Sequence, residues 1–554
     1  MTDYSKTRVR RRYGLALLLL SCVSVMVGEP WPGGAGDDAC PRPAPGAIVQ
    51  QPPELHSQNG RLEFTLKFRI SEDNHGLIRY CYWSDSGLQA PTLRLNPGDE
   101  LVIHFRNELP GKAVRQPVHS TGHHSMHCAD GEVSLGATNL HFHGLNVPST
   151  CHQDDVMQTL IEPAASFEYQ LKIPANTTPG LYWYHPHPHP FSEIQVLGGA
   201  SGAIIVEGMA STYPEIRKLP ERVLVLRDQK LPMSAVRVAS SPGWDVSLNY
   251  VPVLSPDYLP STLETNPHQE EFWRVLNAAA DTIFDLQVMV NNVPQAVRLL
   301  AIDGVPLSTS RTSTGVLLPP GARAEFVITT PNVGDHAQLI TKRWDTGPDG
   351  ENDPQRPLAN IVSVSEPRVQ PGPIRKAAGE STTGKRYASL KNATPAARRK
   401  LYFSEDRQDP SFPGTSFYLT VDGQAPTRYK MEDPPNISAR QGTVEDWILE
   451  NRSREEHVFH IHQIHFQVLE SDGKPVNDPA IRDTIDLPYW KGEGPYPSVK
   501  LRMDFRDPNS IGTLMYHCHI LQHSANGMMG SIQVLPAAKS TRQSRATRRP
   551  KPIG

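Results

Sequence analysis

The chain has 554 residues, of which 52 are proline, and its formal net charge is −3. This length exceeds one domain and indicates about three to four. Many prolines between short apolar runs favour strands and turns over long helices. A charge so close to balance gives no indication of nucleic acid as a partner. After the N-terminus, no apolar run is long enough to span a bilayer.

The first 28 residues resemble an export signal. Arg10, Arg11 and Arg12 precede an apolar stretch at 15–27. The arginines are compatible with a twin-arginine signal; a plain secretory signal and a retained membrane anchor are the alternatives. We expect an exported protein, periplasmic or secreted, whose mature chain has no membrane span.

Six cysteines are present. Cys22 falls in the signal and Cys518 lies among histidines, which leaves Cys40, Cys81, Cys128 and Cys151. In an oxidising compartment this even set allows three pairings. We favour disulfide bonds Cys128–Cys151 and Cys40–Cys81, with free buried thiols as the alternative.

Three stretches share one pattern, a turn followed by alternating apolar residues and a closing Asn. They are 98–107, 271–277 and 442–451, and each predicts a half-buried strand. A second pair of similar stretches, 180–187 and 512–519, leads into glycines and apolar runs at 202–206 and 530–534. Internal repeats of this kind indicate duplicated β-sandwich domains.

We therefore predict an all-β chain with three sandwich units. They span 41–210, 218–366 and 400–536, with a linker at 367–399 and a basic tail at 537–554. The middle unit has strand signals of its own, such as 317–328, but lacks a His-rich strand. The composition of the tail predicts disorder.

The stretch 516–528 contains one thiol, three imidazoles and a thioether. If 515–519 is a β-strand, Cys518 points to one face while His517 and His519 point to the other. One strand could then hold a metal on each face, joined only by the backbone. A thiolate with imidazoles and a weak axial thioether is the ligand set of an electron-transfer copper site.

The 22 histidines are concentrated in a few motifs. A His-X-His pair on a strand puts both imidazoles on one face, so that each pair can serve neighbouring metal ions. A single histidine is usually a surface or core residue, but four such groups beside one cysteine argue against coincidence. The groups are His141 and His143; His185, His187 and His189; His457, His460 and His462; and His517, His519 and His523.

These motifs resemble those of the three-domain multicopper oxidases of the laccase-like branch. The matching patterns are His-Phe-His-Gly, Trp-Tyr-His-Pro-His, His-X-X-His-X-His and His-Cys-His-X-X-X-His-X-X-X-X-Met. The resemblance covers nearly the whole mature chain and implies three cupredoxin-like Greek-key β-sandwich domains. It also implies four copper ions, one blue and mononuclear and three in a trinuclear cluster between the first and third domains.

By the same similarity each ligand has an expected place. The blue copper is expected on Cys518, His457 and His523, with Met528 as the axial group. The single copper of the cluster is expected on His141 and His460. The coupled pair is expected on His143, His185, His187, His462, His517 and His519. His189 and His465 are left outside both sites.

An acid beside the cluster is expected because water formation consumes protons. Asp154 matches the position where the family keeps such an acid, and its expected role is to relay protons to bound oxygen. Asp155 is the competing candidate, and a surface turn is the alternative to both. Two positions depart from the family pattern: Val458 stands where proline is common, and Pro190 where glycine is common.

The function implied is one-electron oxidation of phenols or aromatic amines coupled to reduction of O2 to water. A donor gives one electron and O2 takes four, so a site for the donor must be separate from a site that holds several reducing equivalents. The thioether of Met528 predicts a low or medium reduction potential. The alternatives are a metallo-oxidase acting on Mn(II), Fe(II) or Cu(I), and a copper-free cupredoxin scaffold. With 12 methionines and no Met-rich insert, the Cu(I) version is the weaker one.

Overall fold

The computed structural model describes residues 39–73, 76–111, 128, 134–230, 243–369, 371–374 and 386–538. The predicted export signal at 1–28, part of the predicted linker and nearly all of the basic tail lie outside these residues. The described chain is nearly all-β, with 5 % helix, which confirms the predicted fold class. None of its helices is both long enough and apolar enough to cross a bilayer.

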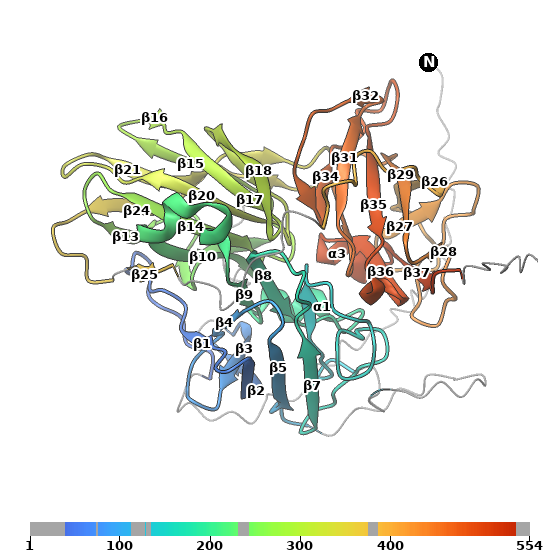
Figure 1. Ribbon diagram of the computed structural model, residues 1–554, viewed down its shortest axis with the longest axis horizontal. Coiled ribbons are helices and arrows are strands. Elements are labelled where there is room, and N and C mark those ends of the chain that lie inside the picture. The colour runs from blue at the N-terminus through green and yellow to red at the C-terminus, as the bar shows by residue number, and fades with distance from the viewer. Residues whose placement is uncertain are drawn as a thin grey trace, which may run out of the picture. The chain divides into compact units, whose positions relative to one another are not determined.

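The first sandwich consists of a sheet of order β1-β4-β9-β8-β6 and a sheet of order β3-β2-β5-β7 (Figure 1). Its elements are β1 Glu54–His56, β2 Arg61–Glu72, β3 Ile78–Ser84, β4 Thr92–Leu95, β5 Glu100–Asn107, β6 His141–His143, β7 Ser166–Lys172, β8 Gly180–His185, α1 Ser192–Leu197 and β9 Gly202–Val206. Apolar side chains of both sheets form one core. Tyr82 and Tyr184, from opposite sheets, have ring centroids 5.5 Å apart.

The second sandwich pairs the sheet β12-β11-β10-β14-β20-β17-β18 with the sheet β13-β24-β21-β15-β16. Its elements are α2 Met209–Thr212, η1 Pro214–Lys218, β10 Pro220–Lys230, β11 Trp244–Leu248, β12 Val251–Val253, β13 Ser261–Thr265, β14 Glu270–Asn277, β15 Phe284–Val290, β16 Val293–Pro294, β17 Val297–Ile302, β18 Val305–Ser313, β19 Val316–Leu318, β20 Arg323–Thr329, β21 Ala337–Thr341, β22 Trp344–Asp345, β23 Asn352–Asp353, β24 Arg356–Ser363 and β25 Gly372–Pro373. Trp273 and Leu339 belong to its core, one from each sheet.

The third sandwich pairs the sheet β27-β26-β29-β35-β31-β32 with the sheet β28-β37-β36-β30-β34. Its elements are β26 Ala397–Asp406, β27 Ser416–Val421, β28 Ile437–Arg440, β29 Thr443–Asn451, β30 His457–Ile461, β31 Phe466–Ser471, β32 Lys474–Pro475, β33 Ile481–Arg482, β34 Thr484–Leu487, β35 Ser498–Phe505, η3 Pro508–Ser510, β36 Gly512–Cys518, α3 Leu521–Ala525 and β37 Met529–Leu535. Trp447 and Tyr516 join its two sheets, with ring centroids 5.8 Å apart. Strand β26 begins within the predicted linker.

The predicted repeats correspond to equivalent strands. The three stretches with a closing Asn are β5, β14 and β29. Each pairs in parallel with one strand (β2, β10 or β26) and antiparallel with another (β7, β20 or β35). In the same way β8 and β36 lie beside β9 and β37. The structure therefore confirms that one strand arrangement is used three times.

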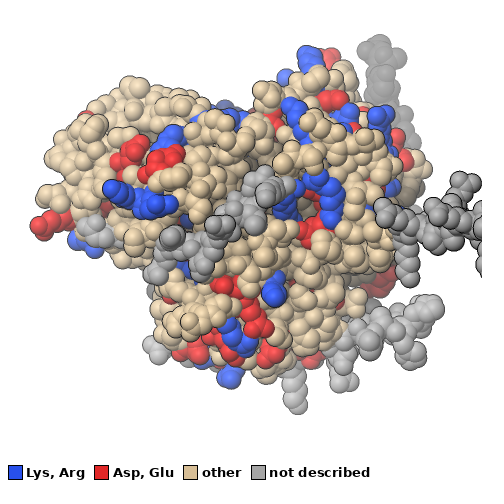
Figure 2. Space-filling model, in the orientation of Figure 1, with Lys and Arg blue, Asp and Glu red and all other residues tan. Residues whose placement is uncertain are grey.

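Two disulfide bonds fasten the first sandwich. Cys40 is bonded to Cys81 and Cys128 to Cys151, with Cα atoms 5.6 and 5.2 Å apart. The favoured pairing is thus confirmed. Among the described residues Cys518 is the free cysteine, and it is buried. On the outside, charged side chains of both signs lie interspersed on the face shown in Figure 2.

Candidate metal centre

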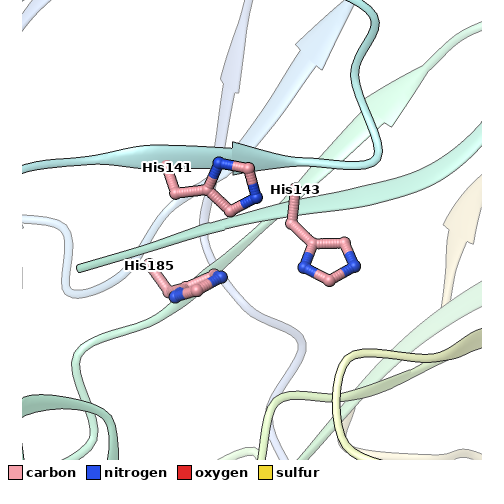
Figure 3. Close-up of side chains that lie close together, drawn as sticks. All are labelled: His141, His143 and His185. Carbon is pink, nitrogen blue, oxygen red and sulfur yellow. The ribbon is translucent and has the colours of Figure 1, made fainter. Parts of the chain in front are cut away.

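Two antiparallel strand pairs bring the histidine motifs together. In the first sandwich His141 of β6 lies opposite His185 of β8, and in the third His460 of β30 lies opposite His517 of β36. Figure 3 shows the imidazoles of His141, His143 and His185 gathered beside their strands. Because period-two alternation turns every second side chain to one face, each His-X-His pair presents both rings to the same space.

Histidines of the first sandwich pack directly against those of the third. The rings of His141 and His462 are stacked with centroids 3.8 Å apart, and those of His143 and His460 with centroids 3.9 Å apart. Apolar residues of α1 and α3 also pack together, Val196 against Leu521 among them. The histidine cluster therefore lies between two sandwiches that are far apart in the chain, since the first ends with β9 at Val206 and the third begins with β26 at Ala397.

All members of this cluster are at most 3 % exposed. They are His141, His143, His185, His187, His460, His462, His517 and His519. Burial, and after it the neighbouring imidazoles, lowers the pKa of His141 and of His462 well below the ordinary value. The rings are therefore neutral at neutral pH, which is the form that binds a metal ion.

Several of these rings have one nitrogen fixed by the protein and the other free. The Nδ1–H group of His460 donates to the carbonyl oxygen of Asp483 at 2.9 Å, and that of His185 to Pro186 at 3.0 Å. His141 Nδ1 lies 3.0 Å from the Asp154 carboxylate. Among the described residues the Nε2 atoms of His141, His185 and His460 are buried without a hydrogen-bond partner.

His143 is held the other way round. Its Nε2 lies 3.3 Å from Asp483 Oδ1, and its Nδ1 has no hydrogen-bond partner among the described residues. A buried polar atom without a partner costs about 1–3 kcal/mol, and the cost falls away if the atom binds a metal. Metal-binding histidines normally donate their other ring N–H to a carboxylate or carbonyl, as these do.

The side chains converge into overlapping groups, in each of which one candidate ligand atom per residue lies within 4.8 Å of the others. These groups are His141, His143 and His185; His141, His460 and His462; His187, His462 and His517; and His143, His460 and Asp483. The donor set is buried, neutral and nitrogen-rich, which fits copper among the transition metals.

A second group lies on the other face of β36. Cys518 Sγ is 3.9 Å from His457 Nδ1 and 3.6 Å from His523 Nδ1, and the two nitrogens are 3.0 Å apart. The outer nitrogens are held elsewhere, His457 Nε2 by Ser453 Oγ at 2.7 Å and His523 Nε2 by Glu455 at 3.1 Å. One sulfur and two nitrogens thus face a common point, which fits a blue-copper ligand set.

Met528 is buried beside this group. Its carbonyl oxygen accepts a hydrogen bond from the Cys518 N–H at 3.0 Å, and its own N–H donates to the His523 carbonyl at 3.0 Å. Backbone hydrogen bonds therefore hold Cys518, His523 and Met528 close together. The ring of Phe417 stacks on His523 with centroids 4.2 Å apart and closes one side.

The alternation predicted for the Cys518 strand is present. Strand β36 carries Cys518 into the core of the third sandwich, while His517 Nε2 lies 3.2 Å from His187 Nε2 in the histidine cluster. Although β36 ends at Cys518, His519 still turns toward the cluster, with its ring centroid 5.0 Å from that of His143. The backbone of Cys518 therefore connects the group around its own sulfur with the histidine cluster, which contains its neighbours His517 and His519.

Asp154 is 1 % exposed and lies against the histidine cluster. Its carboxylate accepts hydrogen bonds from the Phe142 N–H at 3.0 Å and from the Gln463 side chain, in addition to His141. Burial raises the pKa of Asp154 well above its ordinary value. Asp155 instead accepts from the Gln158 N–H at 3.2 Å.

Four polar residues around the two groups were not found from the sequence: Asp483, Arg323, Glu455 and Ser453. No motif marks them, because each is recognisable only by the imidazole or carboxylate that it contacts in space. His465 lies with Nε2 3.6 Å from Asp483 Oδ2, and the His189 ring lies 6.4 Å from that of Tyr429. Among the described residues neither histidine belongs to a group of converging ligand atoms.

Comparison with known proteins gives a consistent result. Sequence models of the multicopper oxidase family match residues 135–211 and 400–538. The chain is 24 % identical to the multicopper oxidase mco of Staphylococcus aureus, over 86 % of this chain and 89 % of that one. It is 23 % identical to a laccase of Bacillus subtilis, over 82 % of this chain and 90 % of that one.

Solved structures agree with the fold. McoA, a multicopper oxidase of Aquifex aeolicus, superposes with a TM-score of 0.64 at 19 % identity, covering 88 % of this chain and 99 % of that one. A Campylobacter jejuni multicopper oxidase described as a metallo-oxidase superposes with a TM-score of 0.63 at 23 % identity, covering 90 % of this chain and 96 % of that one. The chain thus carries two segments that match multicopper oxidase family models, and its relatives and structural neighbours are multicopper oxidases, which indicates a copper oxidoreductase that uses O2.

Proposed function

We propose that the protein is a laccase-like oxidase with four copper ions. It takes single electrons from phenols or aromatic amines at a blue copper and reduces O2 to water at a trinuclear cluster. The observation that carries this proposal is β36, which turns Cys518 to one buried group of donors and its two neighbours to another.

The proposed ligands follow the two groups. Cys518, His457 and His523 would hold the blue copper, with the buried side chain of Met528 as the further proposed ligand. The cluster would be held by His141, His143, His185, His187, His460, His462, His517 and His519. Copper in these places would supply one-electron transfer on the Cys518 side and oxygen reduction on the histidine side.

The chain itself supplies geometry and proton placement. Carbonyl groups and carboxylates hold the protons of the outer ring nitrogens, so the inner nitrogens keep their lone pairs for metal. The histidines of the cluster come from the first and the third sandwich, so the cluster forms only when both sandwiches are folded and packed together. Buried Asp154, bonded to His141 and Phe142, is placed to pass protons to the oxygen side.

The test is a copper-loaded preparation of the mature chain. We expect four copper ions per chain, an intense blue absorbance, and O2 uptake with a phenol or an aromatic amine. Cys518→Ser should abolish the blue band and the turnover, while Ser149→Ala, at a side chain that belongs to neither group, should keep them. Full turnover by Cys518→Ser would overturn the proposal.

A second candidate is a metal-ion donor, such as Fe(II), Mn(II) or Cu(I). His523 is only 1 % exposed, and its outer nitrogen is bonded to Glu455. Burial, and after it the charge of Glu455, raises the pKa of the nearby Glu405 to about 7, with Asp349 contributing. The carboxylates of Glu455 and Glu405 near His523 would attract a metal cation, which is the observation in favour of this second candidate.

One assay separates the two donors. Oxygen uptake is measured with a phenol, an aromatic amine, Fe(II), Mn(II) and Cu(I) for the wild type and for Glu405→Gln. Loss of metal-ion turnover in the variant, with turnover of the phenol retained, supports the metallo-oxidase. Turnover of phenols alone in the wild type excludes it.

We also propose export through the signal at 1–28, to the periplasm or the outside. The two disulfide bonds support it, because such bonds persist in oxidising compartments. N-terminal sequencing of the protein isolated from cell fractions tests this, and a cytoplasmic chain that still begins at Met1 would refute it.

A further inference from the structure

We propose that Arg323, in the second sandwich, is a positioning residue for the trinuclear cluster. It clamps Asp483, and Asp483 in turn orients His143 and His460. The second sandwich supplies none of the proposed ligands, so this would be its direct contribution to the site. The inference rests on the proposed function.

The contacts of Arg323 are those of a fixed fork. The side chain is fully buried, and Nη1 and Nη2 donate to the two carboxylate oxygens of Asp483, each at 2.7 Å. The remaining bonds go to carbonyl groups, from Nε to Leu181 at 3.1 Å and from Nη1 to Gly321 at 3.1 Å. The guanidinium thus links β20 to the first and third sandwiches.

Asp483 reaches two histidines at once. Its carbonyl oxygen accepts from His460 Nδ1 at 2.9 Å, and its Oδ1 lies 3.3 Å from His143 Nε2. Thr484 Oγ1 also donates to Oδ1, at 2.8 Å. These bonds leave His460 Nε2 and His143 Nδ1 free for metal. The position of Asp483 therefore sets which nitrogen each ring offers, through its carbonyl group for His460 and its carboxylate for His143.

The backbone around this clamp leaves no spare room. A Cβ atom at Gly144, which has φ +83°, would collide with Arg323 Nη2 and lie 2.8 Å from Asp483 Oδ2. A Cβ atom at Gly321 would lie 2.9 Å from His143 Cε1. Both glycines are therefore needed for the guanidinium and the imidazoles to approach so closely.

Charge balance at the clamp also involves Asp303. Its Oδ1 is 3.7 Å from Arg323 Nη1 and accepts from the Arg323 N–H at 3.0 Å, while its Oδ2 accepts from the Asp483 N–H at 3.2 Å. Arginine fits this place because its planar fork bonds both oxygens of one carboxylate and still donates to carbonyls. A lysine ammonium keeps the charge but not that geometry.

The experiment compares two buried arginines of the same sandwich. Arg222 is also fully buried and bonds both oxygens of one carboxylate, that of Glu271, at 3.0 and 3.1 Å. Arg323→Lys, Arg323→Met, Arg222→Lys and Arg222→Met are loaded with copper beside the wild type. The readouts are copper per chain, the blue absorbance, the paramagnetic resonance spectrum of the cluster and the free energy of unfolding.

We expect both Arg323 variants to keep the blue absorbance and to hold cluster copper about 10–100-fold more weakly. The Arg222 variants should lose stability with the copper ratio unchanged. Arg323 variants with the wild-type spectrum and copper content, or an equal loss from the Arg222 variants, would overturn the inference. If Arg323→Met does not fold, Arg323→Lys, which keeps charge and most of the volume, decides the test. A wild type that takes up no copper overturns the proposed function instead.

Discussion

The backbone N–H of Val458 donates a hydrogen bond to the Sγ atom of Cys518, with a nitrogen–sulfur distance of 3.4 Å. Val458 follows the proposed blue-copper ligand His457, at the position where the resemblance to multicopper oxidases leads us to expect a proline. Proline has no N–H group, so the departure from the family pattern adds a donor to the sulfur. Hydrogen bonding at the cysteine sulfur is one of the factors that set the potential of a blue-copper site.

Val458→Pro should therefore lower the reduction potential of the blue copper. Removing the donor leaves more negative charge on the sulfur, which favours the oxidised metal. A hydrogen bond of about 1.4 kcal/mol corresponds to roughly 60 mV. Redox titration of the blue absorbance measures the change. Val458→Ala keeps the N–H and should stay near the wild-type potential; an equal fall in both variants would contradict the explanation.

Asp154→Asn should slow oxygen reduction while the blue absorbance stays. The amide keeps the shape of the side chain but cannot pass on a proton, and losing a general acid or base costs on the order of 100-fold or more in kcat. Steady-state O2 uptake, corrected for copper content, checks this. Asp155→Asn is the matched control, because Asp155 bonds Gln158 instead of a cluster histidine. Equal rates in the two variants would remove Asp154 from the proton path.

The pH dependence of stability should contain a contribution from Asp353. Burial raises the pKa of Asp353 from 3.8 to about 7, and the partner Arg356 only partly offsets it. The folded state thus binds this proton more tightly than the unfolded chain. The stability from Asp353 is therefore full below about pH 4 and is lost as pH rises to about 7, by up to about 4 kcal/mol.

Asp353→Asn should flatten that part of the curve. Urea unfolding of the wild type and the variant at about pH 5 and pH 8 measures it. Asp257→Asn, at an exposed position, should keep the wild-type difference between the two pH values. An unchanged slope in Asp353→Asn would show that other groups carry the dependence.

Removal of the Cys40–Cys81 disulfide bond should destabilise the first sandwich. The bond closes a loop with a sequence separation of 41 residues, for which loop entropy predicts a loss of about 4 kcal/mol. The double variant Cys40→Ala/Cys81→Ala, compared with the oxidised wild type in thermal unfolding, checks the value. A melting temperature equal to that of the oxidised wild type would contradict it.

Much of the fold could be predicted because its signals are local. The stretches ending in Asn107, Asn277 and Asn451 carry strand alternation in a few consecutive residues, and their repetition indicated three sandwiches. The His-X-His spacing acts in the same way, since two residues apart on a strand means one shared face. Cys518 with its neighbours could be placed on opposite faces for the same reason.

The sequence by itself thus determined the strand pattern, the fold class and a candidate ligand set, since each depends on the spacing of neighbouring residues. Only the tertiary structure decided which nitrogen of each imidazole is free, because that depends on contacts with distant groups such as Asp154 and Asp483. It also decided that Arg323 contacts Asp483 beside the histidine cluster and that Glu455 contacts His523 beside Cys518. These contacts join residues that are distant in the chain, and no local sequence pattern encodes which distant residues will meet.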